Sequence, residues 1–200
     1  MSSATWRVEI TGNDIETYIE SGINLTQDGT YNFVVTKLPD SGEPYDINGI
    51  TFVTIPAGTF RMGDVEGNGY DREIPVHTVT LSSFEMSIYE VTNAQYAEYL
   101  NKALTTGEIE IITGDVYGKT GDWSGQRYLD IGYGSGENKC WINYSSGSFT
   151  AESGKENRPV VGVTWYGSKA FAEYYGFDLP REAEWEYACR GGNQYKYGTL

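Results

Sequence analysis

The sequence predicts an α+β fold that is rich in loops, with short antiparallel strands and about three helices. Three observations predict it. Apolar residues recur at helical spacing in three stretches, and they alternate with polar residues in several short runs. Glycine and tyrosine are also abundant, at 25 and 17 of 200 residues, which suits short elements packed through aromatic side chains better than a helical bundle.

Residues 1–48 are expected to be separate from the rest, either as the tail of a preceding β domain or as strands packed on the main domain. Apolar residues alternate over 6–10, and a hairpin is predicted around the turn at Asp28 and Gly29. Residues 38–45 have the composition of a linker. The main domain is therefore expected over 49–200.

Short strands are expected at the start of the main domain. The pattern predicts a hairpin between residues 51–55 and 59–62, joined by a turn at 56–58. Two further strands are expected over 76–81 and 84–88, because both stretches alternate with a period of two residues.

Two features near these strands resemble metal or catalytic sites. Residues 64–71 carry oxygen donors and a glycine as in the first half of a calcium loop, but Pro75 stands where a bidentate glutamate is needed. We therefore favour a solvated acidic loop. His77, the single histidine, shares a strand face with Val79 and Leu81, and no nucleophile is placed near it, so we interpret it as structural.

The three helices are predicted from start signals, apolar stripes and end signals. Thr92 and Gln95 form a capping box, and Gly176 and Gly191 stand where left-handed helix ends belong. The residues expected to be buried are Tyr96, Ala97, Leu100 and Ala103 in the first helix, Phe171, Tyr174 and Tyr175 in the second, and Trp185, Ala188 and Cys189 in the third.

Residues 105–157 are the least regular part of the chain. Aromatic residues alternate there with glycines, and long irregular loops in compact domains are often functional. Residues 132–136 resemble a phosphate-binding loop only superficially, because no strand leads into them and no helix follows. A hairpin with its turn at 145–147 is expected to return the chain to the second helix.

The charge of the chain limits its partners. Twenty-eight acidic residues against 14 basic ones give a net charge of -14, which repels nucleic acids and anionic membranes and attracts cations or basic peptides. No apolar run has the roughly 20 residues of a spanning helix. We expect no nucleic acid or membrane partner, and a secreted or otherwise extracytoplasmic parent protein.

Cys140 and Cys189 are the two cysteines. A disulfide between them and two buried free thiols are both open, because sequence spacing does not show the geometry of a bond. The pair does not make a tetrahedral metal site, since no histidine or further cysteine stands nearby in the sequence.

Ordered blocks of sequence point to a family. They are Phe-Val-Thr-Ile-Pro-Ala-Gly-Thr-Phe-Arg-Met-Gly at 52–63, Ile-Pro-Val-His-Thr-Val at 74–79, Tyr-Glu-Val-Thr-Asn-Ala-Gln-Tyr at 89–96, and Pro-Val-x-x-Val-Thr-Trp followed by Leu-Pro-x-Glu-Ala-Glu-Trp-Glu-Tyr-Ala-x-Arg-Gly-Gly at 159–192. Together, over residues 51–197, they resemble the formylglycine-generating enzyme (sulfatase-modifying factor) family. The resemblance implies a C-type-lectin-like fold whose C-terminal part is missing here.

The resemblance also implies a chemistry. Formylglycine-generating members oxidise the cysteine of a Cys-x-Pro-x-Arg peptide, using oxygen and a copper ion held by two cysteine thiolates, and thiolates do select Cu(I). Copper and calcium are thus expected for the full family domain, and no cofactor for this chain, because neither Cys140 nor Cys189 matches the catalytic pair. Cys189 matches a structural half-cystine of some members, and Ala172 stands where many have cysteine.

Two positions of the third helix motif also depart from the family. Arg181 replaces a threonine that would cap the helix, and Asp178 replaces an arginine. Loss of such a cap costs about 1 kcal/mol.

Three candidate substrate-binding residues lie in the irregular segment. Asp115 and Tyr117 resemble a Gly-Asp-x-aromatic segment beside the peptide-binding groove of the family, and Trp123 follows them. A carboxylate there could receive the arginine of the substrate, although an aspartate beside glycine is also an ordinary turn residue. No catalytic or metal-binding residue is predicted in the chain.

Three functions are consistent with the sequence. The chain is the N-terminal portion of an oxidase that acts on a peptide cysteine, a non-catalytic binding module for a peptide, glycan or protein, or a structural domain. In each case residues 1–200 alone are expected to form no formylglycine. Apolar surface left by missing strands is expected to favour self-association.

Overall fold

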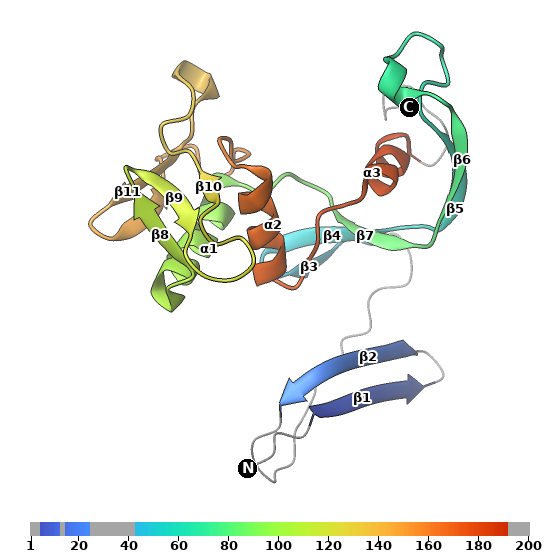
Figure 1. The fold of residues 1–200 in the computed structure, drawn as a ribbon, viewed down its shortest axis with the longest axis horizontal. Helices are drawn as coiled ribbons and strands as arrows, with labels where there is room; N and C mark the ends of the chain where they lie inside the picture. Colours follow the sequence, from blue (N-terminus) through green and yellow to red (C-terminus); the bar gives the residue numbers. More distant parts are fainter. Residues whose placement is uncertain (1–4, 13–14, 25–42, 192–200) are drawn as a thin grey trace. The chain divides into compact units, whose positions relative to one another are not determined.

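The structure is a computed structural model that describes residues 5–12, 15–24 and 43–191 (Figure 1). Its contacts divide the chain into two units, Met1–Asp40 and Ser41–Leu200. In the first unit β1 (Thr5–Gly12) pairs antiparallel with β2 (Ile15–Asn24), and the strand predicted over 6–10 lies in β1. The hairpin predicted around Asp28 and Gly29 lies outside the described residues.

The second unit begins with a long two-stranded ribbon. β4 (Ile50–Ile55) continues into β5 (Gly58–Met62), and β6 (His77–Leu81) continues into β7 (Phe84–Ser87). β4 pairs with β7, β5 pairs with β6, and the register is the same on both sides of a two-residue break in each strand. β3 (Tyr45–Ile47) adds a third strand to β4.

The hairpin predicted between residues 51–55 and 59–62 is therefore wrong. These strands lie end to end, and each pairs with a later strand. Pro56 has no N–H to donate, so the ladder is interrupted there. The chain continues in the same direction into β5. The strands expected over 76–81 and 84–88 are confirmed.

The irregular segment contains a small sheet that the sequence pattern did not predict. β8 (Ile109–Ile112), β9 (Asp115–Gly118) and β10 (Arg127–Leu129) pair in the order β10-β9-β8, all antiparallel. The predicted last hairpin is confirmed as β11 (Ile142–Ser145) and β12 (Ser148–Ala151), whose two-residue turn has positive φ at both positions.

Three α-helices complete the described residues, as the sequence predicts, together with two short 3-10 helices. They are α1 (Asn93–Thr106), α2 (Trp165–Tyr174), α3 (Glu182–Cys189), η1 (Asp71–Glu73) and η2 (Gly136–Asn138). The capping box of α1 is confirmed, because the Gln95 N–H donates to the Thr92 hydroxyl and the Gln95 side chain accepts the Thr92 N–H at 2.9 Å. The α+β fold class is confirmed.

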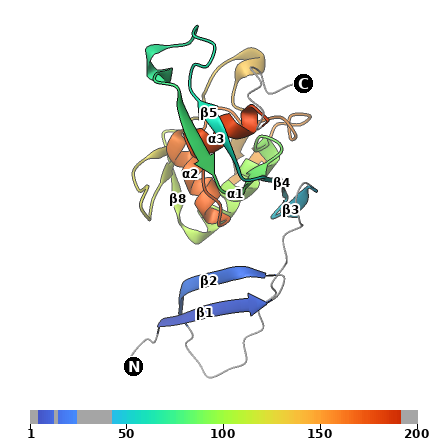
Figure 2. The same cartoon turned by 90° about the vertical axis from the view of Figure 1, so that its right-hand side faces the viewer.

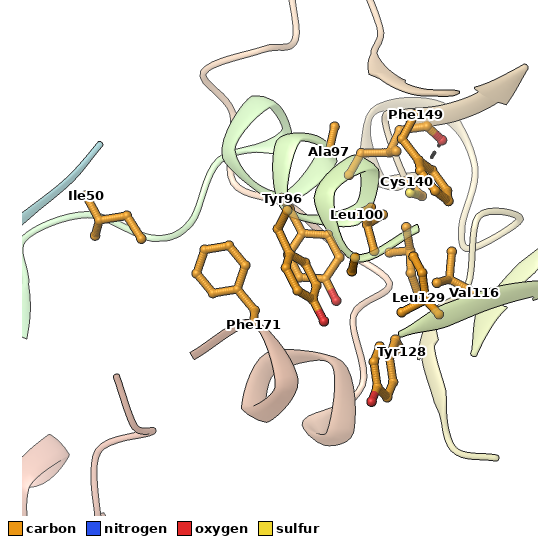
Figure 3. Packing of buried hydrophobic residues seen from close by; sticks show 14 residues of the cluster. Ile50, Tyr96, Ala97, Leu100, Val116, Tyr128, Leu129, Cys140, Phe149 and Phe171 are labelled. Atoms are coloured by element: carbon orange, nitrogen blue, oxygen red, sulfur yellow. Dashed lines mark hydrogen bonds between the residues drawn. The ribbon is translucent and has the colours of Figure 1, made fainter. Parts of the chain in front are cut away.

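The core forms around one face of α1 (Figure 3). Leu100 and Ala103 are fully buried, and the ring of Tyr96 stacks on Phe171 of α2 with centroids 5.6 Å apart. Val116 of β9 and Leu129 of β10 close the other side of the cluster. The short strands are therefore held to the helices by aromatic and branched side chains.

α3 packs on the ribbon, beside β5 (Figure 2). Its buried residue is Tyr187, whose ring lies 5.3 Å from that of Phe60, and Gly58 has no Cβ that would obstruct the Tyr187 hydroxyl. The predicted stripe of Trp185, Ala188 and Cys189 is wrong, since Trp185 and Cys189 are exposed. In so short a helix two faces carry apolar residues, and the position of β5 selects the face of Tyr187.

The start of α3 compensates for the cap that Arg181 cannot provide. A guanidinium accepts no hydrogen bond, but the Glu184 carboxylate accepts the Arg181 N–H at 2.7 Å. Half of a capping box is thus present at this helix.

Candidate functional site

The three predicted substrate-binding residues lie around β9, β10 and the start of α2. Asp115 and Tyr117 alternate with Val116 along β9, so their side chains leave the sheet on the face opposite to the buried Val116. Trp123 lies in the loop between β9 and β10 and reaches α2. Thr164 is the N-cap of α2, and its hydroxyl donates to the Arg127 carbonyl of β10. This hydrogen bond connects the start of α2 with the sheet that carries Asp115 and Tyr117.

Asp115 is held by two donors. Arg127 Nη1 lies 3.2 Å from Asp115 Oδ2 and 3.4 Å from Asp130 Oδ2, and the Ile131 N–H donates to Asp115 Oδ1 at 3.1 Å. The Asp115 side chain is 20% exposed. Two carboxylates share one guanidinium, so this cluster keeps a net negative charge.

Trp123 forms an aromatic patch with two residues that the sequence interpretation did not select. Its ring centroid lies 5.3 Å from that of Trp165 and 5.8 Å from that of Tyr166. Trp165 is 56% exposed and Tyr166 is 36% exposed, whereas Trp123 is half-buried and donates to Glu173 Oε2 at 2.8 Å. We call Trp123, Trp165 and Tyr166 the aromatic patch.

A sequence signal for Trp165 and Tyr166 does exist. At 100° per residue, Trp165 and Tyr166 do not lie on the face of α2 that carries the buried Phe171. The helical periodicity therefore predicts that both side chains are exposed. Two adjacent aromatic residues directly after a helix cap are therefore surface candidates.

A groove of about 950 Å³ is a second candidate site. β7, residues 88–91, residues 159–163 and residues 177–180 line it, together with Phe171 of α2 and Trp185 of α3. Most of these residues are apolar, and those with charge are acidic. The sequence interpretation did not predict this groove, because it forms between segments that are far apart in the chain.

The two cysteines do not form a two-thiolate copper site. Cys140 is buried in the core cluster, and burial raises the pKa of its thiol. Cys189 is exposed at the end of α3, which lies beside β5 and β6 at the opposite end of the second unit from β11 (Figure 1). Both thiols are free, and their separate environments do not fit one copper ion.

In the acidic loop at residues 64–71, the first residue, Asp64, accepts hydrogen bonds from the backbone of the loop. Asp64 accepts the backbone N–H groups of Gly67, Asn68 and Gly69 at 2.8 to 3.1 Å, and these bonds lower the pKa of its carboxyl. Among the residues that the structure describes, no three His, Cys, Asp or Glu side chains are gathered to hold a metal ion. The lone His77 is exposed and contacts the Pro75 carbonyl at 3.0 Å.

No helix in the described ranges combines the length and the apolar character that crossing a bilayer requires.

The chain is similar to known proteins over most of its length. Residues 42–199 match the family model of the Sulfatase-modifying factor enzyme 1-like domain. The formylglycine-generating enzyme of Streptomyces coelicolor is 36% identical over 152 residues, covering 70% of this chain and 47% of that protein. The enzyme of the same name from Mus musculus is 35% identical over 150 residues, covering 71% and 40%. This chain thus spans less than half the length of these relatives.

Two further matches have other names. The serine/threonine-protein kinase pkn1 of Chlamydia pneumoniae is 37% identical over 140 residues, which are 70% of this chain and 19% of the kinase. Among solved structures, PvdO from Pseudomonas aeruginosa covers 82% of this chain and 56% of its own, with a TM-score of 0.49 and 21% identity.

Proposed function

Because the chain belongs to the family of Sulfatase-modifying factor enzyme 1-like domains, we propose that it binds a cysteine-containing peptide segment of another protein, as part of a formylglycine-generating domain. The aromatic patch and the Asp115 cluster, which the hydrogen bond from Thr164 to the Arg127 carbonyl connects, carry this proposal. Exposed aromatic rings bind apolar side chains and peptide planes, and carboxylates bind the basic residue of such a peptide.

The Asp115 cluster has capacity for a further donor. Two carboxylate oxygens offer about four lone-pair sites, and those of Asp115 take up one bond from Arg127 and one from Ile131. A peptide guanidinium can therefore bind Asp115 next to Arg127. Trp165, which directly follows the Thr164 cap of α2, would then contact the neighbouring part of the peptide.

Titration calorimetry with a Cys-x-Pro-x-Arg peptide tests this binding. We expect Trp165→Ala to weaken binding about tenfold, since a large exposed ring is lost. Tyr70→Ala, at an exposed tyrosine on the loop between β5 and β6, is the matched control and should bind normally. Equal affinity of the wild type and Trp165→Ala would refute a role for the aromatic patch.

A double-mutant cycle tests the carboxylate. Replacing the peptide arginine by glutamine should weaken binding about 10-fold to 100-fold in the wild type, the scale of a hydrogen bond to a charged group. The same replacement should have little effect in the Asp115→Asn variant. If both proteins lose the same affinity, the peptide arginine does not bind Asp115.

A second candidate function, for residues 1–200 by themselves, is peptide binding without chemistry, because neither of their two cysteines matches the catalytic pair that the family resemblance implies. A buried Cys140 with a raised thiol pKa and an exposed Cys189 do not act together as thiolate ligands. We expect the 200-residue chain, incubated with the peptide, copper and oxygen, to give no product with the mass loss of converting a thiol to an aldehyde. Such a product would overturn the non-catalytic proposal and leave the binding proposal intact.

A further inference from the structure

The chain contains two Asn-Gly pairs, and both lie at exposed positions. Asn48 and Gly49 form the two-residue turn between β3 and β4, with φ values of 55° and 77°. Asn68 and Gly69 lie in the acidic loop between β5 and β6. In such a pair the glycine nitrogen can attack the asparagine side chain, since glycine has no side chain to obstruct the approach. Each pair is therefore a candidate site of spontaneous deamidation.

Deamidation needs water and no other reactant. The glycine nitrogen loses its proton and forms a bond to Cγ of the asparagine, and the bond between Cγ and Nδ2 breaks with release of ammonia. Water then opens the resulting succinimide ring at either of its two carbonyls, which leaves aspartate or isoaspartate. The first step requires a glycine nitrogen that is free to lose its proton and to turn toward Cγ.

An aspartate carboxylate holds this nitrogen in both pairs. The Gly49 N–H donates to Asp46 Oδ1 at 2.9 Å. The Gly69 N–H donates to Asp64 Oδ2, also at 2.9 Å. Loss of the amide proton would break a hydrogen bond to a charged group and place a negative nitrogen beside a negative oxygen. Two separate turns thus restrain the reacting atom in the same way.

The acidic loop adds further restraints around Asn68. Asp64 Oδ1 accepts the N–H groups of Gly67 and Asn68 at 2.8 and 3.1 Å. Glu73 packs so closely on Gly69 that a Cβ there would overlap its carboxylate. The bonds from the loop backbone lower the pKa of the Asp64 carboxyl, so the ionised carboxylate is too weak a base to remove an amide proton itself. Asp64 therefore opposes the reaction and does not assist it.

The turn at Asn48 is restrained by the strands on either side. Ile47 pairs with Ile50 across the turn, and Gln95 Nε2 of α1 donates to the Gly49 carbonyl at 2.6 Å. An isoaspartate at position 48 would add one CH₂ group to the backbone of a two-residue turn, which this pairing does not accommodate. Deamidation there would also disturb the contact between the turn and α1.

We propose that Asn48 and Asn68 are deamidation sites of this protein, and that Asp46 and Asp64 protect them in the folded state. The modification converts an asparagine side chain to a mixture of aspartate and isoaspartate. This goes beyond the proposed function, since it concerns a hairpin turn and a loop and uses neither the aromatic patch nor the Asp115 cluster.

Incubation of the full 200-residue chain at mildly alkaline pH, followed by peptide mass spectrometry, tests the proposal. In the wild type, both asparagines should react at least about tenfold more slowly in the native protein than in urea. Asp64→Ala should accelerate the reaction of Asn68 about 10-fold to 100-fold, the scale of a hydrogen bond to a charged group, and leave Asn48 unchanged. Asp46→Ala should do the reverse, so each variant is the matched control of the other.

Two further variants separate the carboxylate of Asp64 from the rest of the loop. Asp64→Asn keeps an oxygen acceptor without the charge, so the rate at Asn68 should lie between those of the wild type and Asp64→Ala. Asp71→Ala removes another carboxylate near the same loop and should leave this rate unchanged.

Four results would overturn the proposal. Equal rates for the native and the unfolded wild type would show that the fold gives no protection. Acceleration of both asparagines in Asp64→Ala would show a general loosening of the domain. A slower reaction of Asn68 in Asp64→Ala would show that the carboxylate acts as a base. A product that contains aspartate but no isoaspartate would show direct hydrolysis of the side chain, without attack by the glycine nitrogen.

Discussion

Asn93 is the residue whose replacement tests the packing of the fold most directly. It is the first residue of α1, and its side chain is fully buried. Its Nδ2 donates to the Lys155 carbonyl at 2.9 Å and to the Arg158 carbonyl at 3.0 Å. These bonds tie the start of α1 to residues 155–158.

The free energy of unfolding should fall by about 2 kcal/mol in Asn93→Ala, since two hydrogen bonds of about 1 kcal/mol each are lost. Asn93→Asp should cost more than Asn93→Ala, because a carboxylate would face two carbonyl oxygens without water. Helix electrostatics alone gives the opposite sign, since an acidic residue in the first turn of a helix stabilises it by about 0.3 to 1 kcal/mol.

The pH dependence separates these two effects. The introduced carboxyl is disfavoured in its charged form when folded, so its folded pKa lies above its unfolded value. The protonated form can donate one hydrogen bond, so the deficit of Asn93→Asp should shrink as pH falls through the folded pKa. Urea unfolding followed by tryptophan fluorescence measures both variants at several pH values.

Asn143→Asp on the exposed part of β11 is the control and should change stability by less than about 0.5 kcal/mol. If Asn93→Asp is as stable as the wild type at neutral pH, Asn93 does not hold the two carbonyls and the reasoning is refuted.

Three further predictions concern separate parts of the domain. Gly167→Ala in α2 should lower the free energy of unfolding, measured in urea, by more than about 2 kcal/mol, because the new Cβ would overlap the Tyr128 carbonyl and lie 2.7 Å from the Tyr96 hydroxyl. Alanine normally favours a helix over glycine by about 1 kcal/mol, so the expected sign is the opposite of the helix propensity. An unchanged unfolding midpoint would contradict this. Iodoacetamide at mildly alkaline pH should modify Cys189 in the native protein and Cys140 only after unfolding, as peptide mass spectrometry would show, and equal rates would contradict the burial of Cys140. Hydrogen bonds from Lys155 and then from Arg158 lower the pKa of the Glu137 carboxyl. The wild type should therefore be more stable than Glu137→Gln above about pH 4, and this difference should disappear as pH falls through the folded pKa. A difference in thermal midpoint that does not change with pH would refute this prediction.

Local signals in the sequence predict the elements whose contacts are local. The capping box of Thr92 and Gln95 fixes the start of α1, because the two residues satisfy each other's backbone. The turn between β11 and β12 is similar, since Ser146 and Gly147 supply the two positive φ values that a two-residue hairpin needs. The ordered motifs predict the family, which residues 42–199 confirm.

Contacts between distant residues explain what the sequence pattern does not predict. Alternation shows which side chains share a face of a strand but not which strand pairs with it, so Thr54 finds Glu85 and not a residue of the adjacent β5. The same limit applies to α3, where the face of Tyr187 is selected by Phe60 and Gly58. The aromatic patch needs both Trp123 and Trp165, which are far apart in the chain.

Residues 155–164 connect the core to both candidate sites. The Lys155 and Arg158 carbonyls accept hydrogen bonds from the Asn93 side chain, and Val160 donates its N–H to the Val91 carbonyl at 2.9 Å. Residues 159–163 also line the groove. The same segment ends at Thr164, which bonds to Arg127 and Tyr128 of β10 and places Trp165 in the aromatic patch. A segment without regular structure of its own is thus positioned by the backbone of its neighbours. For this reason the sites on its two sides depend on the packing of α1 as well as on the residues that line them.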